Sequence, residues 1–199
     1  MTKKIGGRMK NGAMAAFLFL MITCIAVNAS AFDFSADMIS SGPEGTVSGK
    51  IFSSKNKVRM EMAGTIAITR MDKNVAWMLM PSESMYIEQP IDMRNVVATE
   101  DKMPGEIERT FLGDEGIDGK NAKKYRIVYE SGGNKETVLQ WIDQETSIPV
   151  RTQAENGGWI VEYKNLNTGA QPDSLFEVPA GYNKMSMDIP AMAGMSLDQ

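Results

Sequence analysis

The stretch that decides the fold is residues 124–164, which read KYRIVYESGGNKETVLQWIDQETSIPVRTQAENGGWIVEYK. Apolar and polar residues alternate along much of it. This period of two is typical of a β-strand with one buried and one solvent-exposed face. Clusters of Gly, Asn, Asp and Ser interrupt the alternation about every ten residues and are typical of tight turns. The stretch therefore predicts an antiparallel meander.

The same pattern continues upstream. Met60 and Met62 alternate with Lys57, Arg59 and Glu61. The next segments, 65–71 and 75–80, predict a hairpin across a turn at 72–74, and a short strand at 85–87 follows. We expect a mainly β fold, as a sandwich, a barrel or a curved sheet.

Few segments favour a helix. Residues 95–102 fit either a helix start or a loop, and a short turn is expected at 172–176. Residues 113–116 (GDEG) and 118–121 (DGKN) are rich in turn formers and are expected to be turns. Helices are therefore predicted to be minor elements.

The first 31 residues have the pattern of a signal peptide. A basic start with Lys3, Lys4, Arg8 and Lys10 precedes the apolar run AMAAFLFLMITCIAV at 13–27. The sequence Ala-Ser-Ala ending at Ala31 suits signal peptidase, so we expect cleavage there and a periplasmic protein. The alternative is a retained anchor, but the run is shorter than the roughly twenty residues of a membrane span. Cys24 lies in the run and matches a lipidation motif poorly, so it is interpreted as an apolar residue of the signal.

The composition excludes several classes of protein. The chain of 199 residues has no histidine and one cysteine, so a Ser-His-Asp triad and imidazole metal sites are absent from its sequence. Loss of the four basic residues of the signal takes the net charge from -4 to -8. Such an acidic chain disfavours nucleic acid as a partner. No glycine-rich phosphate loop precedes a helix, and the acidic clusters are typical of a solvated surface. We expect no enzymatic activity and no cofactor.

Methionine is the unusual residue type, with seventeen in the whole chain. Pairs of the form Met-x-Met occur at 60/62, 78/80 and 185/187, and on a strand such pairs share one face. Plain core or groove lining is the preferred interpretation, because methionine suits adaptable apolar surfaces. Thioethers are also Cu(I) ligands. The copper candidates preferred on sequence are four tail residues, namely Met185, Met187, Met192 and Met195.

Three motifs resemble the LolA/LolB-like lipoprotein-carrier superfamily. They are the strand-turn-strand signature WIDQETSIPVR at 141–151, the closing element PDSLFEVPAGY at 172–182, and the run GKNAKKYRI at 119–127. The resemblance covers roughly residues 34–182. It implies a LolA-like half-barrel, in which a curved antiparallel sheet is closed on its concave face by short helices, and an apolar cavity that takes acyl chains.

The resulting organisation is a signal peptide at 1–31, a half-barrel domain at 32–184 and a Met-rich flexible tail at 185–199. The expected function is non-enzymatic binding of a lipid or lipoprotein acyl chain by a monomer, with an envelope protein partner and outer-membrane association also considered. The alternatives are a ligand-free envelope sensor or interaction module, and a Cu(I)-handling protein. The residues expected to line the apolar groove are Met60, Met62, Ile66, Ile68, Trp77, Leu79, Tyr125, Ile127, Tyr129 and Trp141.

Overall fold

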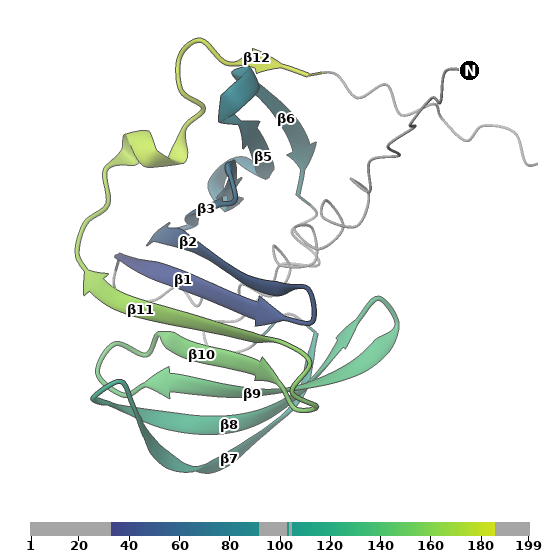
Figure 1. Cartoon of the computed structure of the whole chain (residues 1–199), viewed down its shortest axis with the longest axis vertical. Coiled ribbons are helices and arrows are strands. Elements are labelled where there is room, and N and C mark those ends of the chain that lie inside the picture. Colours follow the sequence, from purple (N-terminus) through teal and green to yellow (C-terminus); the bar gives the residue numbers. More distant parts are fainter. Residues whose placement is uncertain (1–32, 92–102, 104, 186–199) are drawn as a thin grey trace, which may run out of the picture.

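The computed structural model describes residues 33–91, 103 and 105–185 (Figure 1). Several sequence predictions lie outside the described residues. They are the signal peptide with Cys24, the helix candidate at 95–102, and the tail methionines Met187, Met192 and Met195.

All strands of the described chain belong to one sheet of twelve. They are β1 (Phe34–Gly42), β2 (Gly45–Ser54), β3 (Lys57–Met62), β4 (Thr65–Arg70), β5 (Val75–Met80), β6 (Met85–Pro90), β7 (Glu106–Ile117), β8 (Lys120–Ser131), β9 (Asn134–Asp143), β10 (Pro149–Ala154), β11 (Ile160–Thr168) and β12 (Asn183–Lys184). The helical elements are short 3-10 turns: η1 (Met71–Lys73), η2 (Pro81–Glu83) and η4 (Asp173–Phe176).

The sheet consists of two meanders joined at a central seam. The order is β12-β6-β5-β4-β3-β2-β1-β11-β10-β9-β8-β7, so β1 and β11 are neighbours in the middle. All neighbours pair in antiparallel fashion except β12, which runs parallel to β6. The sheet is open and curved (Figure 1). The prediction of a curved antiparallel half-barrel is confirmed.

The β3–β4 hairpin fixes which side chains share a face. Ala63 and Gly64 form its two-residue turn, with φ of 48° and 79°. Such a turn suits the twist of the strands and needs left-handed backbone, for which Gly64 is the favoured residue type. Met62 consequently pairs with Thr65, and Glu61 pairs with Ile66. Side chains of paired residues lie on one face, so Ile66 lies on the face opposite Met62.

Two features of the strands differ from the sequence predictions. The expected turn at 113–116 is wrong, because these residues continue β7 and pair with β8 from Lys124 to Asn121. The strand absorbs its irregularity in two bulges, which leave Ile107 and Leu112 without a paired residue on β8. Strands β1 and β2 were not predicted, although Phe34, Ala36 and Met38 alternate with more exposed residues.

The chain after β11 runs from the middle of the sheet to the edge formed by β6 (Figure 1). We call residues 169–185 the strap. It contains η4, where the short turn at 172–176 was expected, and ends at β12 on the edge of β6. Among the described residues, no helix has the length and apolar character needed to cross a membrane.

Candidate functional site

The six strands β1–β6 have two chemically different faces. Following the register from β1 to β6 places six methionines on one side, which we call the methionine face. They are Met38, Met60, Met62, Met78, Met80 and Met85. We call the opposite side the strap face, because the strap packs on it.

Charge is confined to the strap face of these six strands. The charged residues of β1–β6 are Asp37, Lys50, Lys57, Arg59, Glu61, Arg70 and Glu88, and the register places all of them there. The methionine face of β1–β6 therefore carries only apolar, small or uncharged polar side chains. An ionic ligand group would find no counter-ion on this face, whereas a hydrocarbon chain would displace water from apolar surface.

Part of the methionine face is deeply buried. Met38, Ile51 and Met60 belong to one apolar cluster with Phe34 and Met62. Gly49 is required there, because a Cβ at this position would lie 2.5 Å from the Cγ of Met62 and 2.2 Å from the carbonyl oxygen of Glu61. The missing side chain of Gly49 thus makes room for Met62 over β2, between β1 and β3.

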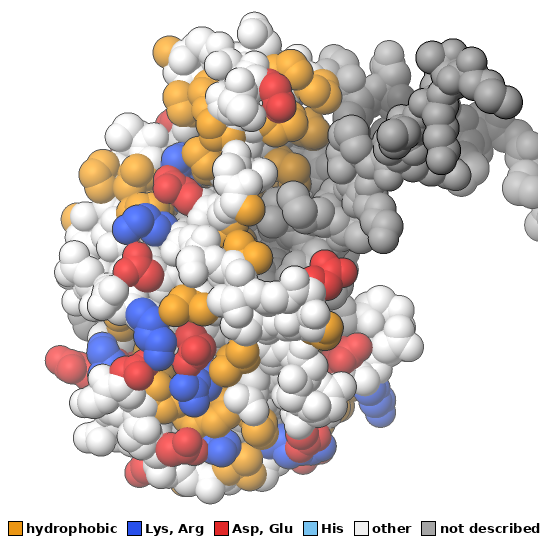
Figure 2. All heavy atoms as spheres, viewed as in Figure 1, with side chains coloured by type: hydrophobic (Ala, Val, Ile, Leu, Met, Phe, Trp, Pro, Cys, Tyr) orange, Lys and Arg blue, Asp and Glu red, His pale blue; other side chains and the backbone are white. Residues whose placement is uncertain are grey.

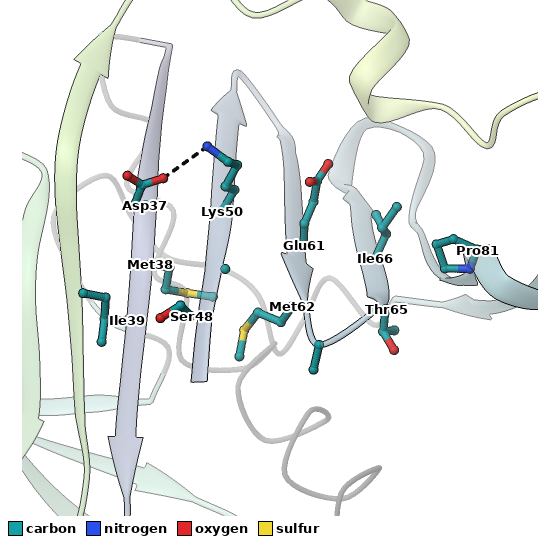
Figure 3. Close-up of a pocket in the computed structure, with 13 residues that line it drawn as sticks. Asp37, Met38, Ile39, Ser48, Lys50, Glu61, Met62, Thr65, Ile66 and Pro81 are labelled. Atoms are coloured by element: carbon teal, nitrogen blue, oxygen red, sulfur yellow. Dashed lines mark hydrogen bonds and ion pairs between the residues drawn. The ribbon is translucent and has the colours of Figure 1, made fainter. Parts of the chain in front are cut away.

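A groove of about 690 Å³ opens where the ends of β1–β4 meet the β3–β4 turn. The methionine face contributes Met38, Gly49, Met62 and Thr65, and the strap face contributes Asp37, Ile39, Ser48, Lys50, Glu61 and Ile66 (Figure 3). Asp37 and Lys50 form an ion pair at 3.2 Å. Residues of both faces therefore line the groove, and its mixture of apolar and charged side chains suits an amphipathic molecule.

The strap face is filled by the chain itself. Phe176 of η4 is fully buried against Ile68 and Leu79, and Trp77 and Tyr86 pack around them. The strap adds further apolar contacts at Leu175, Val178 and Tyr182. The apolar residues of β4–β6 on this face consequently pack against the strap.

Two arginines of the sheet hold the strap through its backbone. Arg59 Nη1 donates a hydrogen bond to the carbonyl oxygen of Leu175 at 3.0 Å, and Arg70 Nη1 donates to that of Phe176 at 3.2 Å. Arg70 also forms a two-pronged contact with Asp72, at 2.8 and 2.7 Å. These bonds satisfy polar backbone atoms next to the buried Phe176, where an unpaired carbonyl would be costly.

Carboxylates complete the attachment of the strap. Glu177 pairs with Arg70 and with Lys73, and Asp173 pairs with Lys57 at 2.6 Å. Burial opposes ionisation of Glu177, but hydrogen bonds from Lys73 and Arg70 outweigh it and lower its pKa. The hydrogen bond from Arg70 lowers the pKa of Asp72. Both acids are therefore more easily ionised in the folded protein than in the unfolded chain.

The ten predicted groove residues divide equally between the two faces, so all ten do not line a single groove. The side that continues the methionine face carries Met60, Met62, Tyr125, Ile127 and Tyr129. The side of the strap face carries Ile66, Ile68, Trp77, Leu79 and Trp141. Alternation along a strand shows which of its residues share a face. The length of each turn decides on which face of the sheet the apolar residues of the next strand lie.

The methionine face continues into the second meander. Ile127, Tyr129 and Val138 form a cluster there with Met103, and Tyr125 and Trp159 pack against it. Met103 precedes β7 and is nearly fully buried. Met103 is not among the predicted groove residues, because it is isolated in sequence between a segment of uncertain type and Pro104.

The described residues contain no group of three or more carboxylate, cysteine or histidine residues placed to hold a metal ion. Of the tail methionines, Met185 is described, and its backbone N–H donates to the carbonyl oxygen of Tyr86 at 2.7 Å. The strap thus places Met185 next to β6.

The family model described as "Domain of unknown function (DUF4412)" matches residues 32–147. The match covers more than half of the chain, and the chain belongs to this family. No curated protein matches the sequence.

Two of the similar solved structures contain the protein MucB. The crystal structure of MucB in complex with MucA(peri) is 14% identical, with a TM-score of 0.52, and covers 86% of this chain and 62% of that chain. MucB alone is 12% identical, with a TM-score of 0.50, and covers 86% and 65%. The present chain thus spans less than two thirds of MucB, and the similarity concerns the fold.

A LolA superfamily protein from Nitrosomonas europaea is also among the similar structures. It is 14% identical, with a TM-score of 0.35, and covers 75% of this chain and 90% of that chain. The open curved sheet of this chain has the half-barrel architecture that the sequence motifs suggested.

Proposed function

We propose that this member of the DUF4412 family is an exported, periplasmic binding protein that holds an apolar ligand on its methionine face. The ligand class is a lipid or a lipoprotein acyl chain, and no covalent chemistry takes place. The observation that carries this proposal is the segregation of charge, because all seven charged residues of β1–β6 lie on the other face.

The groove at the β3–β4 turn is the proposed point of entry. Its volume of about 690 Å³ falls in the range of small-molecule sites, and Met38 and Met62 line it from the methionine face. Each Å² of hydrocarbon removed from water supplies about 25 cal/mol. Unbranched, polarisable methionine side chains adapt to a flexible chain more readily than branched residues.

Blocking the groove tests the proposal. Thr65 lies on the methionine face, is partly exposed and lines the groove, so Thr65→Trp is expected to fill the entry without introducing a charge. Thr69 lies on the same strand and the same face and is also partly exposed, but it does not line the groove, so Thr69→Trp is the matched control. Native mass spectrometry of the purified proteins should find co-purified lipid on the original chain and on the control, and a much smaller fraction on Thr65→Trp.

The result can contradict the proposal in two ways. Absence of lipid from the original chain, combined with no binding of a fluorescent fatty acid, would exclude a lipid-binding function. Equal lipid occupancy of Thr65→Trp and Thr69→Trp would place the ligand elsewhere on the molecule.

A protein partner is the second candidate function. Three of the four exposed large apolar residues of the described chain, Ile107, Phe111 and Leu112, lie on the edge strand β7. The two bulges carry Ile107 and Leu112, and MucB was crystallised with MucA(peri). Exposed apolar groups that lie close together are typical of contact surfaces.

Cross-linking in envelope extracts would test this candidate. A specific cross-linked protein should be lost from the double variant Ile107→Ser with Leu112→Ser and retained in a Val47→Ser control, since Val47 is an exposed apolar residue of β2. Retention of the same adduct in both variants would exclude β7 as the contact.

A further inference from the structure

A corner of the sheet brings together methionines that are distant in sequence. Met78 and Met80 lie two residues apart on β5, and Met85 on β6 is the paired residue of Met80. All three lie on the methionine face, and all are partly exposed. Paired residues on adjacent strands have Cβ atoms about 5 Å apart, and a methionine side chain extends several bonds further.

The strap adds a fourth thioether beside these three. Asn183 and Lys184 of β12 pair in parallel with Met85 and Tyr86. Lys184 lies on the strap face, where its amine contacts Glu88 at 2.6 Å, so Met185 lies on the methionine face. The hydrogen bond from Met185 to Tyr86 continues the pairing by one residue. Met185 is therefore diagonally adjacent to Met85.

These methionines have no assigned place in the apolar core. Met38, Met60 and Met62 belong to a buried cluster, whereas Met78, Met80, Met85 and Met185 belong to none of the four clusters found among the described residues. Figure 2 shows apolar side chains gathered at the surface around the end of the molecule where β5, β6 and β12 lie. The buried clusters of the described residues thus do not include these four thioethers.

We propose that Met78, Met80 and Met85 form a thioether site for Cu(I), with Met185 as an additional ligand supplied by the strap. Thioether sulfur is a soft donor that suits Cu(I), and three such donors can surround the ion without any histidine or cysteine. The methionine face of β5 and β6 carries no carboxylate, so it offers nothing to Mg²⁺ or Ca²⁺, which prefer oxygen ligands.

This site differs from the one favoured by the sequence, which relied on four tail methionines. Register moves the centre of the site to β5 and β6 and keeps only Met185 of the tail set. It is also separate from the groove at the β3–β4 turn, whose methionines are Met38 and Met62. Copper binding and lipid binding can therefore succeed or fail independently.

Anaerobic titration with Cu(I), in competition with a chromogenic Cu(I) chelator, tests the proposal on the purified protein. We expect one strongly bound Cu(I) per chain, with only sulfur ligands in its X-ray absorption spectrum. The double variant Met80→Leu with Met85→Leu should weaken binding by about tenfold or more, because it removes two soft donors while keeping the volume and the apolar character. Met71→Leu is the matched control, since Met71 lies in η1, outside the corner.

The remaining variant measures the contribution of the strap. Met185→Leu should weaken Cu(I) binding less than the double variant, because three donors remain. Circular dichroism should show that all variants are folded. The proposal is overturned if the chelator removes all copper from the original chain, or if the double variant binds Cu(I) as tightly as Met71→Leu does. It is also overturned if binding is lost only on changing Met187, Met192 and Met195 to leucine.

Discussion

The two faces of β1–β6 are built from the same strands, but their apolar side chains have different surroundings. On the strap face, Phe176 fills the space over Ile68 and Leu79, and arginines hold the strap in place. The methionine face has neither charges nor ion pairs of its own on these strands. The strap face is therefore specified by directional bonds, whereas the methionine face is adaptable.

The strongest test of this contrast is removal of the strap's apolar anchor. Phe176→Ala should reduce the free energy of unfolding by about 3–5 kcal/mol, the usual cost of truncating a fully buried aromatic side chain. Urea denaturation followed by tryptophan fluorescence would measure it. A loss below about 1 kcal/mol, as expected of a poorly packed site, would mean that the strap face is not specified by Phe176.

Loss of the buried guanidinium should have the next largest effect. Arg70→Met keeps much of the apolar stem but leaves the carbonyl of Phe176 and the carboxylate of Asp72 without their donor, so we expect a loss of about 1–3 kcal/mol. Arg126→Met is the control, because Arg126 forms an exposed pair with Glu155, worth about 0–1 kcal/mol. Equal losses in both variants would remove the distinction between strap attachment and an ordinary surface ion pair.

Acid should weaken the strap with the smallest effect of the three. The pKa values of Asp72 and Glu177 are lowered by folding, so these groups stabilise the strap above their unfolded pKa values and lose that effect as pH falls through the folded values. Both carboxylates are partly exposed, and solvent screening limits the total to about 1 kcal/mol.

Hydrogen exchange can detect this weakening. Below about pH 4, the protection factors of the amides of Leu175, Asn183 and Met185 should fall relative to those of Ile127 and Val138 in β8 and β9. Uniform loss of protection across all five amides would indicate global unfolding and contradict a local effect at the strap.

Much of the fold was predictable from the sequence, because it depends on local patterns. The alternation around Tyr125, Ile127 and Tyr129 and the glycine turns identify the hairpins directly. The second half of β7 was predicted wrongly as a turn, because Gly113 and Gly116 resemble turn residues while cross-strand pairing keeps them extended.

Only half of the predicted groove residues lie on the methionine face, because strand register decides the face and alternation alone does not reveal it. Met62 and Ile66 are both apolar, and their assignment to opposite faces depends on a turn of two residues at Ala63 and Gly64. The filling of the strap face by Phe176 depends on a contact between residues more than one hundred positions apart, which a single sequence does not reveal.

The central seam has a consequence for the order in which the molecule is assembled. β1 is the first strand of the sheet along the chain, and one of its edges pairs with β11, which lies more than one hundred residues later. Strands β1–β6 can pair in sequence before β11 is in place, and that edge of β1 then exposes unpaired backbone groups beside Phe34 and Met38. Completion of the sheet is thus a long-range event that slows folding, and an intermediate without β11 is prone to association through that edge.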